Sequence, residues 1–123
     1  VFTRLSDVVV QSDAKAIERV LNNLIDNAFK YSPDGTTIEI KVRKQDNSIR
    51  ISVLDSGEGV PEEEQKLVFN RFYRTAKARA NTKQGSGLGL AIVRNLVTNL
   101  QGEVGVEPRK NGGSEFWFSL PTP

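Results

Sequence analysis

The stretch IERVLNNLIDNAFKYSP, residues 17–33, decides the fold of this chain. Its apolar residues recur at the spacing of one helix face, and they are Ile17, Val20, Leu21, Leu24, Ile25 and Ala28. Ser12 or Asp13 can cap the start of this helix, and the run SPDG at 32–35 stops it. An amphipathic helix buries its apolar face, so we expect the rest of the chain to supply a covering layer.

Alternating apolar residues after this helix predict the strands of that layer. The runs 38–42 and 49–53, with Ile or Val at every second position, are joined by the polar turn QDNS. This pattern predicts an antiparallel hairpin with one buried face on each strand. Two closing strands are expected at 103–107 and 115–120, on either side of the turn NGG.

Four other segments complete the expected elements. Residues 8–10 are three valines, which predict a short strand. Pro61 and the acidic run that follows it predict a short helix reaching about Phe69. Residues 88–100 have helical periodicity, whereas residues 75–87 have no apolar period and predict a mobile loop.

Together these elements predict one domain, residues 1–123, with an α/β (α+β) two-layer sandwich fold. The sheet is expected to be mixed but mainly antiparallel, and about three helices should cover one of its faces. No apolar run reaches the roughly 18 residues of a membrane span, so we expect the chain itself to be soluble.

The composition limits the available chemistry. The chain contains no Cys and no His, which excludes disulfides, thiolate nucleophiles and histidine ligands. Only oxygen ligands remain for a metal, and they suit Mg²⁺. The net charge is +2, which argues against nucleic-acid binding over the whole surface, although five basic residues lie between Arg71 and Lys83.

Polar residues on the first helix form a candidate site. Asn23, Asn27 and Lys30 fall on one narrow stripe beside the apolar face. Two amides and an ammonium group can hold a hydrated Mg²⁺ and a phosphate, because amide oxygens ligate hard cations. The alternative is a set of ordinary solvated side chains.

Two glycine-rich segments are further candidates. One, DSGEG, starts at Asp55 directly after a predicted strand, and the other, GSGLG, starts at Gly85 directly before a predicted helix. Glycines let the backbone approach a phosphate closely, and a helix N-terminus attracts anions. Asp55 can accept a hydrogen bond from an exocyclic amine such as that of adenine. The alternatives are turn chemistry for the glycines and turn capping for Asp55.

Four blocks of the sequence, in order, resemble the ATP-binding domain of two-component sensor histidine kinases, which belongs to the GHKL superfamily. The blocks are LNNLIDNAFKYSP (21–33), DSGEGVP (55–61), VFNRFYR (68–74) and GSGLGLAIV (85–93). They resemble the N box, the first glycine box, the F box and the second glycine box of that family. The resemblance implies the Bergerat ATP-binding fold and a Mg-ATP-dependent protein histidine kinase. It also implies a cytoplasmic location, either free or as the cytoplasmic part of a membrane-anchored sensor.

The resemblance also implies roles for individual residues. Those implied for binding the nucleotide are Asn23, Asn27, Lys30, Tyr31, Asp55, Gly57, Gly59, Val60, Gly85, Ser86, Gly87, Leu88 and Gly89. Asn27 would ligate Mg²⁺, and Asn23 and Lys30 would assist at the metal and phosphates. Asp55 would recognise the adenine amine. Arg71 or Arg74 would reach the phosphates, and both are implied as catalytic together with Asn23 and Lys30.

The chain departs from the family pattern at two places. Asn70 stands where the F box usually carries an acid, which puts docking onto the phosphoacceptor domain in doubt. Leu100-Gln101-Gly102 stands where a His-Gly-Gly-like run is common, and this concerns packing. The segment Gly112 to Phe116 resembles the glycine, hydroxyl and aromatic pattern at the family's C-terminal end, and it leads us to expect that the domain is complete there.

Several functions stay open at this point. Hydrolysing members of the superfamily are expected to carry a Glu in place of Asn23, and an amide cannot act as a general base, which favours a kinase over an ATPase. An anti-sigma-type serine kinase, a catalytically silent nucleotide sensor and a nucleic-acid module built on the basic segment are the other readings.

The implied partners follow from the kinase reading. A histidine-bearing dimerisation domain would supply the nucleophile that this chain lacks, and a response regulator receiver domain would take the phosphoryl group onward. The chain alone is expected to be monomeric and unable to autophosphorylate, because it contains no histidine.

Overall fold

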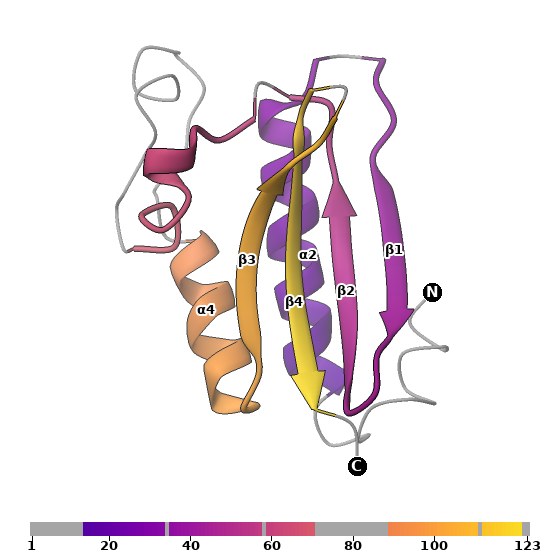
Figure 1. The fold of residues 1–123 in the computed structure, drawn as a ribbon, viewed down its shortest axis with the longest axis vertical. Helices are drawn as coiled ribbons and strands as arrows, with labels where there is room; N and C mark the ends of the chain where they lie inside the picture. Colours follow the sequence, from indigo (N-terminus) through magenta and orange to yellow (C-terminus); the bar gives the residue numbers. More distant parts are fainter. Residues whose placement is uncertain (1–13, 34, 58, 71–88, 111, 122–123) are drawn as a thin grey trace.

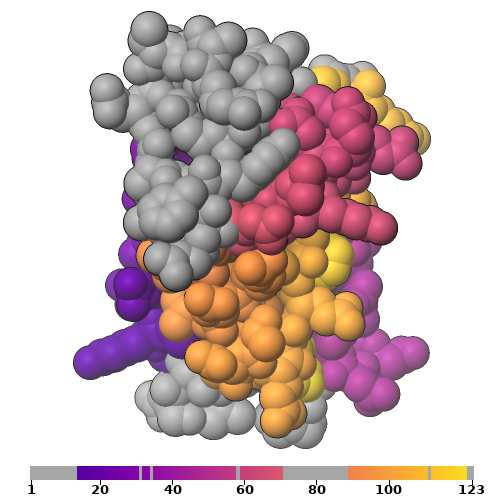
Figure 2. All heavy atoms as spheres, turned by 90° about the vertical axis from the view of Figure 1, so that its left-hand side faces the viewer, coloured from indigo at the N-terminus to yellow at the C-terminus, as the bar shows by residue number. Residues whose placement is uncertain are grey.

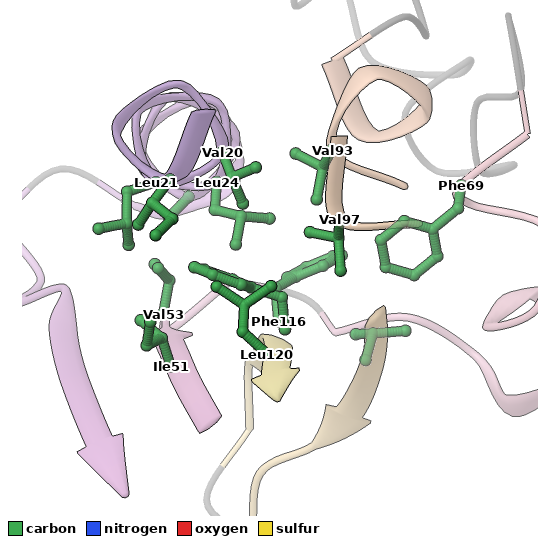
Figure 3. Packing of buried hydrophobic residues seen from close by; sticks show 14 of the residues in the cluster. Val20, Leu21, Leu24, Ile51, Val53, Phe69, Val93, Val97, Phe116 and Leu120 are labelled. Atoms are coloured by element: carbon green, nitrogen blue, oxygen red, sulfur yellow. The ribbon is translucent and has the colours of Figure 1, made fainter. Parts of the chain in front are cut away.

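A computed structural model of the chain describes residues 14–33, 35–57, 59–70, 89–110 and 112–121. The elements are α2 (Ala14–Tyr31), β1 (Glu39–Lys44), β2 (Ser48–Leu54), the 3₁₀ turn η2 (Glu62–Glu64), α4 (Gly89–Asn99), β3 (Glu103–Pro108) and β4 (Ser114–Pro121). The strands form one antiparallel sheet in the order β1-β2-β4-β3. In Figure 1 the sheet lies in front of α2, and Figure 3 shows α2 and α4 on the same side of the sheet, so both helices cover the same face. The predicted two-layer α+β architecture is confirmed.

The core lies between the sheet and the two helices. The strand register places apolar residues opposite one another, so that Val53 pairs with Phe116 and Ile51 with Phe118. These side chains face the apolar stripes of α2 and α4 (Figure 3), which contribute Val20, Leu21, Leu24, Val93 and Val97. Full burial of each such side chain contributes about 1.5–3 kcal/mol, so this contact stabilises the α2 face that the sequence predicted to be buried.

The predicted hairpin is present, but the expected buried face of its first strand is wrong. Every residue of β1 is exposed, including Ile40 at 37% and Val42 at 48%. The cause is the position of β1 at the edge of the sheet, since α2 packs over β2 and no described helix covers β1. The inner strand β2 is buried over nearly its whole length.

The predicted short helix is also only partly present. One 3₁₀ turn, η2, is followed by further turns up to Phe69 rather than by regular helix. Pro61 precedes this turn in an extended conformation with ψ 146°, so it lies outside the first turn where it was expected. So short a helix gains little from its own hydrogen bonds. Packing anchors the segment instead, because the ring of Phe69 meets the ring of Phe116 edge-on at 6.3 Å between centroids.

The remaining predictions have mixed outcomes. The helix expected at 88–100 is α4, and the two closing strands are β3 and β4. Two full helices and one 3₁₀ turn are described where about three helices were expected. The strand predicted at 8–10, the cap at Ser12 or Asp13 and the loop at 75–87 lie outside the described residues. Within the described residues no helix is long and apolar enough to cross a membrane.

Candidate functional site

The candidate residues gather at one end of the two layers. α2 and β2 run in the same direction, so their C-terminal ends lie together, next to the start of β4 (Figure 1). Asp55 is the first residue after β2, and Lys30 lies in the last turn of α2. The fold therefore brings the polar stripe of α2 and the DSGEG segment to the same end of the molecule.

Asp55 is fixed by hydrogen bonds at the end of β2. Its side chain is buried, with 4% of the residue exposed. Oδ1 accepts from the backbone N–H of Gly57 at 2.9 Å and of Ser114 at 3.1 Å. The turn-capping role considered for Asp55 is therefore present. Oδ2 takes part in neither bond, so the same carboxylate retains an oxygen that can accept from a ligand.

The surroundings of Asp55 have opposing effects on the pKa of its carboxyl group. Burial raises the pKa of this carboxyl above 3.8, its ordinary value, because the charged form loses water. The two backbone N–H bonds, from Gly57 and Ser114, and then the positive charge of Arg109 act in the opposite direction. Desolvation has the largest effect on the pKa. The other three effects favour the ionised carboxylate, which is the form that can accept a hydrogen bond from a ligand.

Arg109, which the sequence analysis did not single out, joins three segments around Asp55. Its Nη1 donates to the backbone carbonyl of Asp55 at 2.8 Å, and its Nη2 lies 3.7 Å from the Oε1 of Glu39 on β1. No local pattern in the sequence could have identified it, because Arg109 and Asp55 are 54 positions apart.

Gly113 and Gly59 make this end of the sheet compact. Gly113 has φ +89°, and a Cβ there would lie 2.1 Å from the carbonyl oxygen of Asp55. Gly59 has φ +83°, and a Cβ there would lie 3.3 Å from the carbonyl oxygen of Gly113. Only glycine combines this backbone conformation with so close an approach. Gly113, which the sequence predicted as part of a simple turn, thus packs directly against the backbone of Asp55.

Gly57 and Val60, which were also predicted in this segment, have defined contacts. Gly57 donates its N–H to the carboxylate, as described above. Val60 is half-buried and packs against the core cluster, and its carbonyl accepts a hydrogen bond from the Nε2 of Gln65 at 3.2 Å. Val60 follows Asp55 by five positions, and a half-buried apolar side chain of this kind is suited to contact a planar base.

The stripe on α2 is at the border of the core, as the helical wheel predicted. Asn23 and Asn27 are half-buried, and Lys30 is exposed. The Nδ2 of Asn23 is buried and has no hydrogen-bond partner among the described residues. A buried donor without a partner is costly, and it fits a site that a ligand acceptor completes. The amide oxygens of Asn23 and Asn27 are suitable donors to Mg²⁺, so these residues fit a Mg-phosphate group.

Several predicted site residues are not placed. Arg71, Arg74, Gly85, Ser86, Gly87 and Leu88 lie outside the described residues, and so does the side chain of Tyr31. Gly89 is the first residue of α4, and no atom lies within 4 Å of a Cβ built on it. The described residues therefore place the C-terminal end of α2 and the Asp55 segment at one end of the molecule, and of the second glycine box they include only Gly89.

Asn70, the departure in the F box, has a defined contact. The Nη1 of Arg94 on α4 donates to its Oδ1 at 3.0 Å. Segment 59–70 and α4 lie side by side on the face shown in Figure 2. An acid at this position would pair with Arg94 as an ion pair, whereas the amide of Asn70 keeps the contact as a hydrogen bond without the charge.

Comparison with known proteins places these features in context. The model of the family "Histidine kinase-, DNA gyrase B-, and HSP90-like ATPase" matches residues 12–123. The sensor histidine kinase WalK of Bacillus subtilis is 40% identical over 117 residues, which are 94% of this chain and 19% of that protein. The chain therefore spans about a fifth of the length of this curated relative.

Solved structures show the same similarity in three dimensions. The mycobacterial sensor histidine kinase MprB superposes with a TM-score of 0.78 at 32% identity, covering 89% of this chain and 72% of that one. Full-length ShkA, solved in complex with AMPPNP, gives a TM-score of 0.77 at 32% identity and covers 89% of this chain and 22% of that one. The range of the family match, residues 12–123, includes the α2 stripe and the Asp55 segment.

Proposed function

We propose that this chain, which belongs to the family of histidine kinase-, DNA gyrase B- and HSP90-like ATPases, binds Mg-ATP and phosphorylates a histidine on a separate domain. The family match covers nearly the whole chain, and the relatives compared above are sensor histidine kinases. The chain is thus a histidine-kinase catalytic domain by descent. We infer its nucleotide, the roles of its residues and its partners from the site described above.

One observation carries the choice of nucleotide. Asp55 is a buried carboxylate with one oxygen held by two backbone N–H groups and the other left for a ligand donor. The exocyclic amine of adenine is such a donor, whereas guanine presents a carbonyl at the corresponding position. AMPPNP, the ligand of the ShkA complex, is an adenine nucleotide and supports this choice.

The α2 stripe would hold the other end of the nucleotide. Asn23 and Asn27 offer amide oxygens to the metal, and the buried Nδ2 of Asn23 would donate to a phosphate oxygen. Lys30, exposed on the same stripe, would add a positive charge beside the phosphates. Bound Mg²⁺ would neutralise phosphate charge that these uncharged amides cannot.

The reaction then needs only positioning and charge neutralisation from this chain. A ring nitrogen of the incoming histidine forms a bond to the γ-phosphorus, and the bond to the bridging oxygen breaks, so that ADP leaves. Hydrolysing members of the superfamily are expected to carry, at the position of Asn23, a Glu that activates water. Asn23 has an amide in its place, and an amide cannot act as a general base. Transfer to a protein nucleophile is therefore favoured over hydrolysis.

The partners belong to the same proposal. The nucleophile would come from a histidine-bearing dimerisation domain, since the chain has no histidine of its own. A response regulator receiver domain would accept the phosphoryl group afterwards. The Asn70–Arg94 contact at the F box lies on the face that we assign to docking of the dimerisation domain.

A labelling experiment tests the proposal. The chain alone, incubated with Mg²⁺ and γ-labelled ATP, should acquire no acid-labile phosphate and should turn over ATP slowly. Adding a dimerisation domain from a sensor kinase should produce acid-labile label on that domain, and replacing its histidine by Gln should remove the label. Rapid ATP hydrolysis with no transfer to any histidine-bearing domain would instead favour the ATPase branch of the family.

A further inference from the structure

The turn between β3 and β4 forms hydrogen bonds with both the backbone and the carboxylate of Asp55. The N–H of Asp55 donates to the carbonyl of Ser114 at 2.9 Å, and the N–H of Ser114 donates back to Oδ1 at 3.1 Å. The carbonyl of Asp55 accepts from Arg109 at 2.8 Å. Asp55 thus has its N–H, its carbonyl and one carboxylate oxygen engaged by a single turn, residues 109–114.

Arg109 is the only side chain in this set of contacts, because the others are made by backbone groups that most residues could supply. Its side chain is 27% exposed, so the guanidinium is partly shielded from water. The bond to the Asp55 carbonyl fixes the backbone dihedrals of Asp55, and with them the direction in which the carboxylate leaves the chain.

The same guanidinium is an electrostatic neighbour of the carboxylate. Its positive charge lowers the pKa of Asp55 and so opposes the effect of burial. The carboxyl must be ionised to accept a hydrogen bond on Oδ2 while Oδ1 holds two N–H groups. Arg109 therefore favours both the direction and the charge state in which Asp55 can recognise an amine.

We propose that Arg109 is a positioning residue for base recognition, which holds Asp55 in the conformation that distinguishes an adenine from a base without the exocyclic amine. This inference rests on the proposed function of the chain as an ATP-binding domain. Arg109 is not a catalytic residue, since it touches the carbonyl of Asp55 and the carboxylate of Glu39.

The alternative role of Arg109 is purely structural. The guanidinium lies 3.7 Å from Glu39 on β1, and this exposed ion pair could tether the edge strand without any effect on the base. The two roles predict different results, because a tether acts on every ligand alike. Glu39→Gln removes the ion pair and leaves the bond to Asp55, whereas Arg109→Ala removes both.

A comparison of two ligands provides the test. ATP carries the exocyclic amine, and purine riboside 5′-triphosphate carries hydrogen in its place, with the same ribose and phosphates. Affinities of the whole chain for both, with Mg²⁺ and by calorimetry, give a preference ratio that depends on the amine. Thermal melting of each variant establishes that it is folded.

We expect Arg109→Ala to reduce the preference for ATP by about fivefold, part of the value of a hydrogen bond to a charged group, while binding of the amine-free ligand stays the same. Arg109→Lys keeps the charge and one donor, so its ratio should lie between those of Arg109→Ala and the natural chain. Glu39→Gln, and Lys110→Ala as a matched loss of an exposed charge from the same turn, should leave the ratio unchanged.

Equal losses for the two ligands in Arg109→Ala, or an unchanged ratio, would overturn the proposal and leave Arg109 as a tether. If Arg109→Ala melts below the assay temperature, Arg109→Lys and Glu39→Gln are compared instead. A reduced preference for ATP in Arg109→Lys alone supports the positioning role. Equal preferences in the two variants refute it. A natural chain that binds neither ligand would refute the proposed function itself, which is a different result from a chain that prefers ATP regardless of Arg109.

Discussion

Asp55 and the polar stripe of α2 lie at the same end of the molecule but are held in opposite ways. Asp55 is enclosed by backbone N–H groups, by Arg109 and by a close-packed glycine. On the stripe, the buried Nδ2 of Asn23 has no partner among the described residues, and Lys30 is exposed. The fold itself therefore organises the half of the site that would recognise the base, and it leaves the half that would hold metal and phosphate to be completed by the ligand.

This difference suits what each half would bind under the proposed function. A purine is rigid and uncharged, so a fixed acceptor distinguishes it best. A Mg-triphosphate is flexible and highly charged, and it brings its own acceptors and counter-ion. Buried amide groups that have no partner until such a ligand binds lower the stability of the free protein, whereas the contacts of Asp55 are part of the fold.

The largest effect is expected from a change in the enclosed half of the site, which is Asp55 and the groups that surround it. Gly113→Ala forces a Cβ to within 2.1 Å of the Asp55 carbonyl oxygen at φ +89°, so the turn must move away from Asp55. We expect a loss of about 3 kcal/mol or more in the free energy of unfolding, together with loss of ATP binding. Urea denaturation measures the first and calorimetry the second.

Gly112→Ala is the matched control, because Gly112 also has positive φ, +94°, but no atom lies within 4 Å of its Cβ. It should cost only the left-handed backbone strain, about 1 kcal/mol, and should leave binding intact. Similar losses in the two variants would mean that the close approach to Asp55 has no importance of its own.

The corresponding change in the open half should affect binding and not folding. Asn27→Ala removes the proposed Mg²⁺ ligand, so we expect Mg-ATP affinity to fall by about 100-fold. The free energy of unfolding should change by no more than about 0.5 kcal/mol, because Asn27 is at the border of the core. Asn22→Ala, at an exposed position of the same helix, is the control. An unchanged Mg-ATP affinity in folded Asn27→Ala would contradict the metal assignment.

Asp55→Asn separates the two functions of the enclosed carboxylate. The amide oxygen of Asn can still accept from Gly57 and Ser114, so the turn should persist. The amide nitrogen replaces Oδ2 and donates, so we expect affinity for adenine nucleotides to fall about tenfold and the preference over guanine to weaken. Titrations with ATP and GTP measure both effects. An equal loss for the two bases would make Asp55 a structural residue.

The pH dependence of the same variant has a definite sign. Burial raises the pKa of Asp55 in the folded chain, so its charged form is disfavoured there relative to the unfolded chain. Stability from this group is present below its unfolded pKa and is lost as the pH rises through the raised pKa. Asp55→Asn lacks this loss, and its stability relative to the natural chain should be greater near pH 7 than near pH 4. A difference that shrinks with rising pH would contradict the raised pKa.

The comparison also explains what the sequence could and could not predict. Local patterns placed Asp55 after a strand and Asn23, Asn27 and Lys30 on one stripe, because helical and strand periodicity act over a few residues. They missed Arg109 and the packing of Gly113, because these contacts join positions that are 54 or more apart in sequence. The exposed face of β1 was missed for a similar reason, since alternation indicates a strand but not whether it is an inner or an edge strand.

A change at Asn23 tests whether the open half of the site, the polar stripe of α2, lowers the stability of the free protein. Asn23→Ala replaces a buried amide without a described partner by the best helix former, so the ligand-free chain should become more stable by about 1 kcal/mol. Asn22→Ala gives the helix-propensity part alone, about 0.5 kcal/mol, because Asn22 is exposed. The excess of the first gain over the second is the cost of the buried amide. With saturating Mg-ATP the natural chain should become more stable than Asn23→Ala, because the ligand stabilises the natural chain through Asn23. A loss of stability in ligand-free Asn23→Ala would mean that this amide is satisfied before the nucleotide binds.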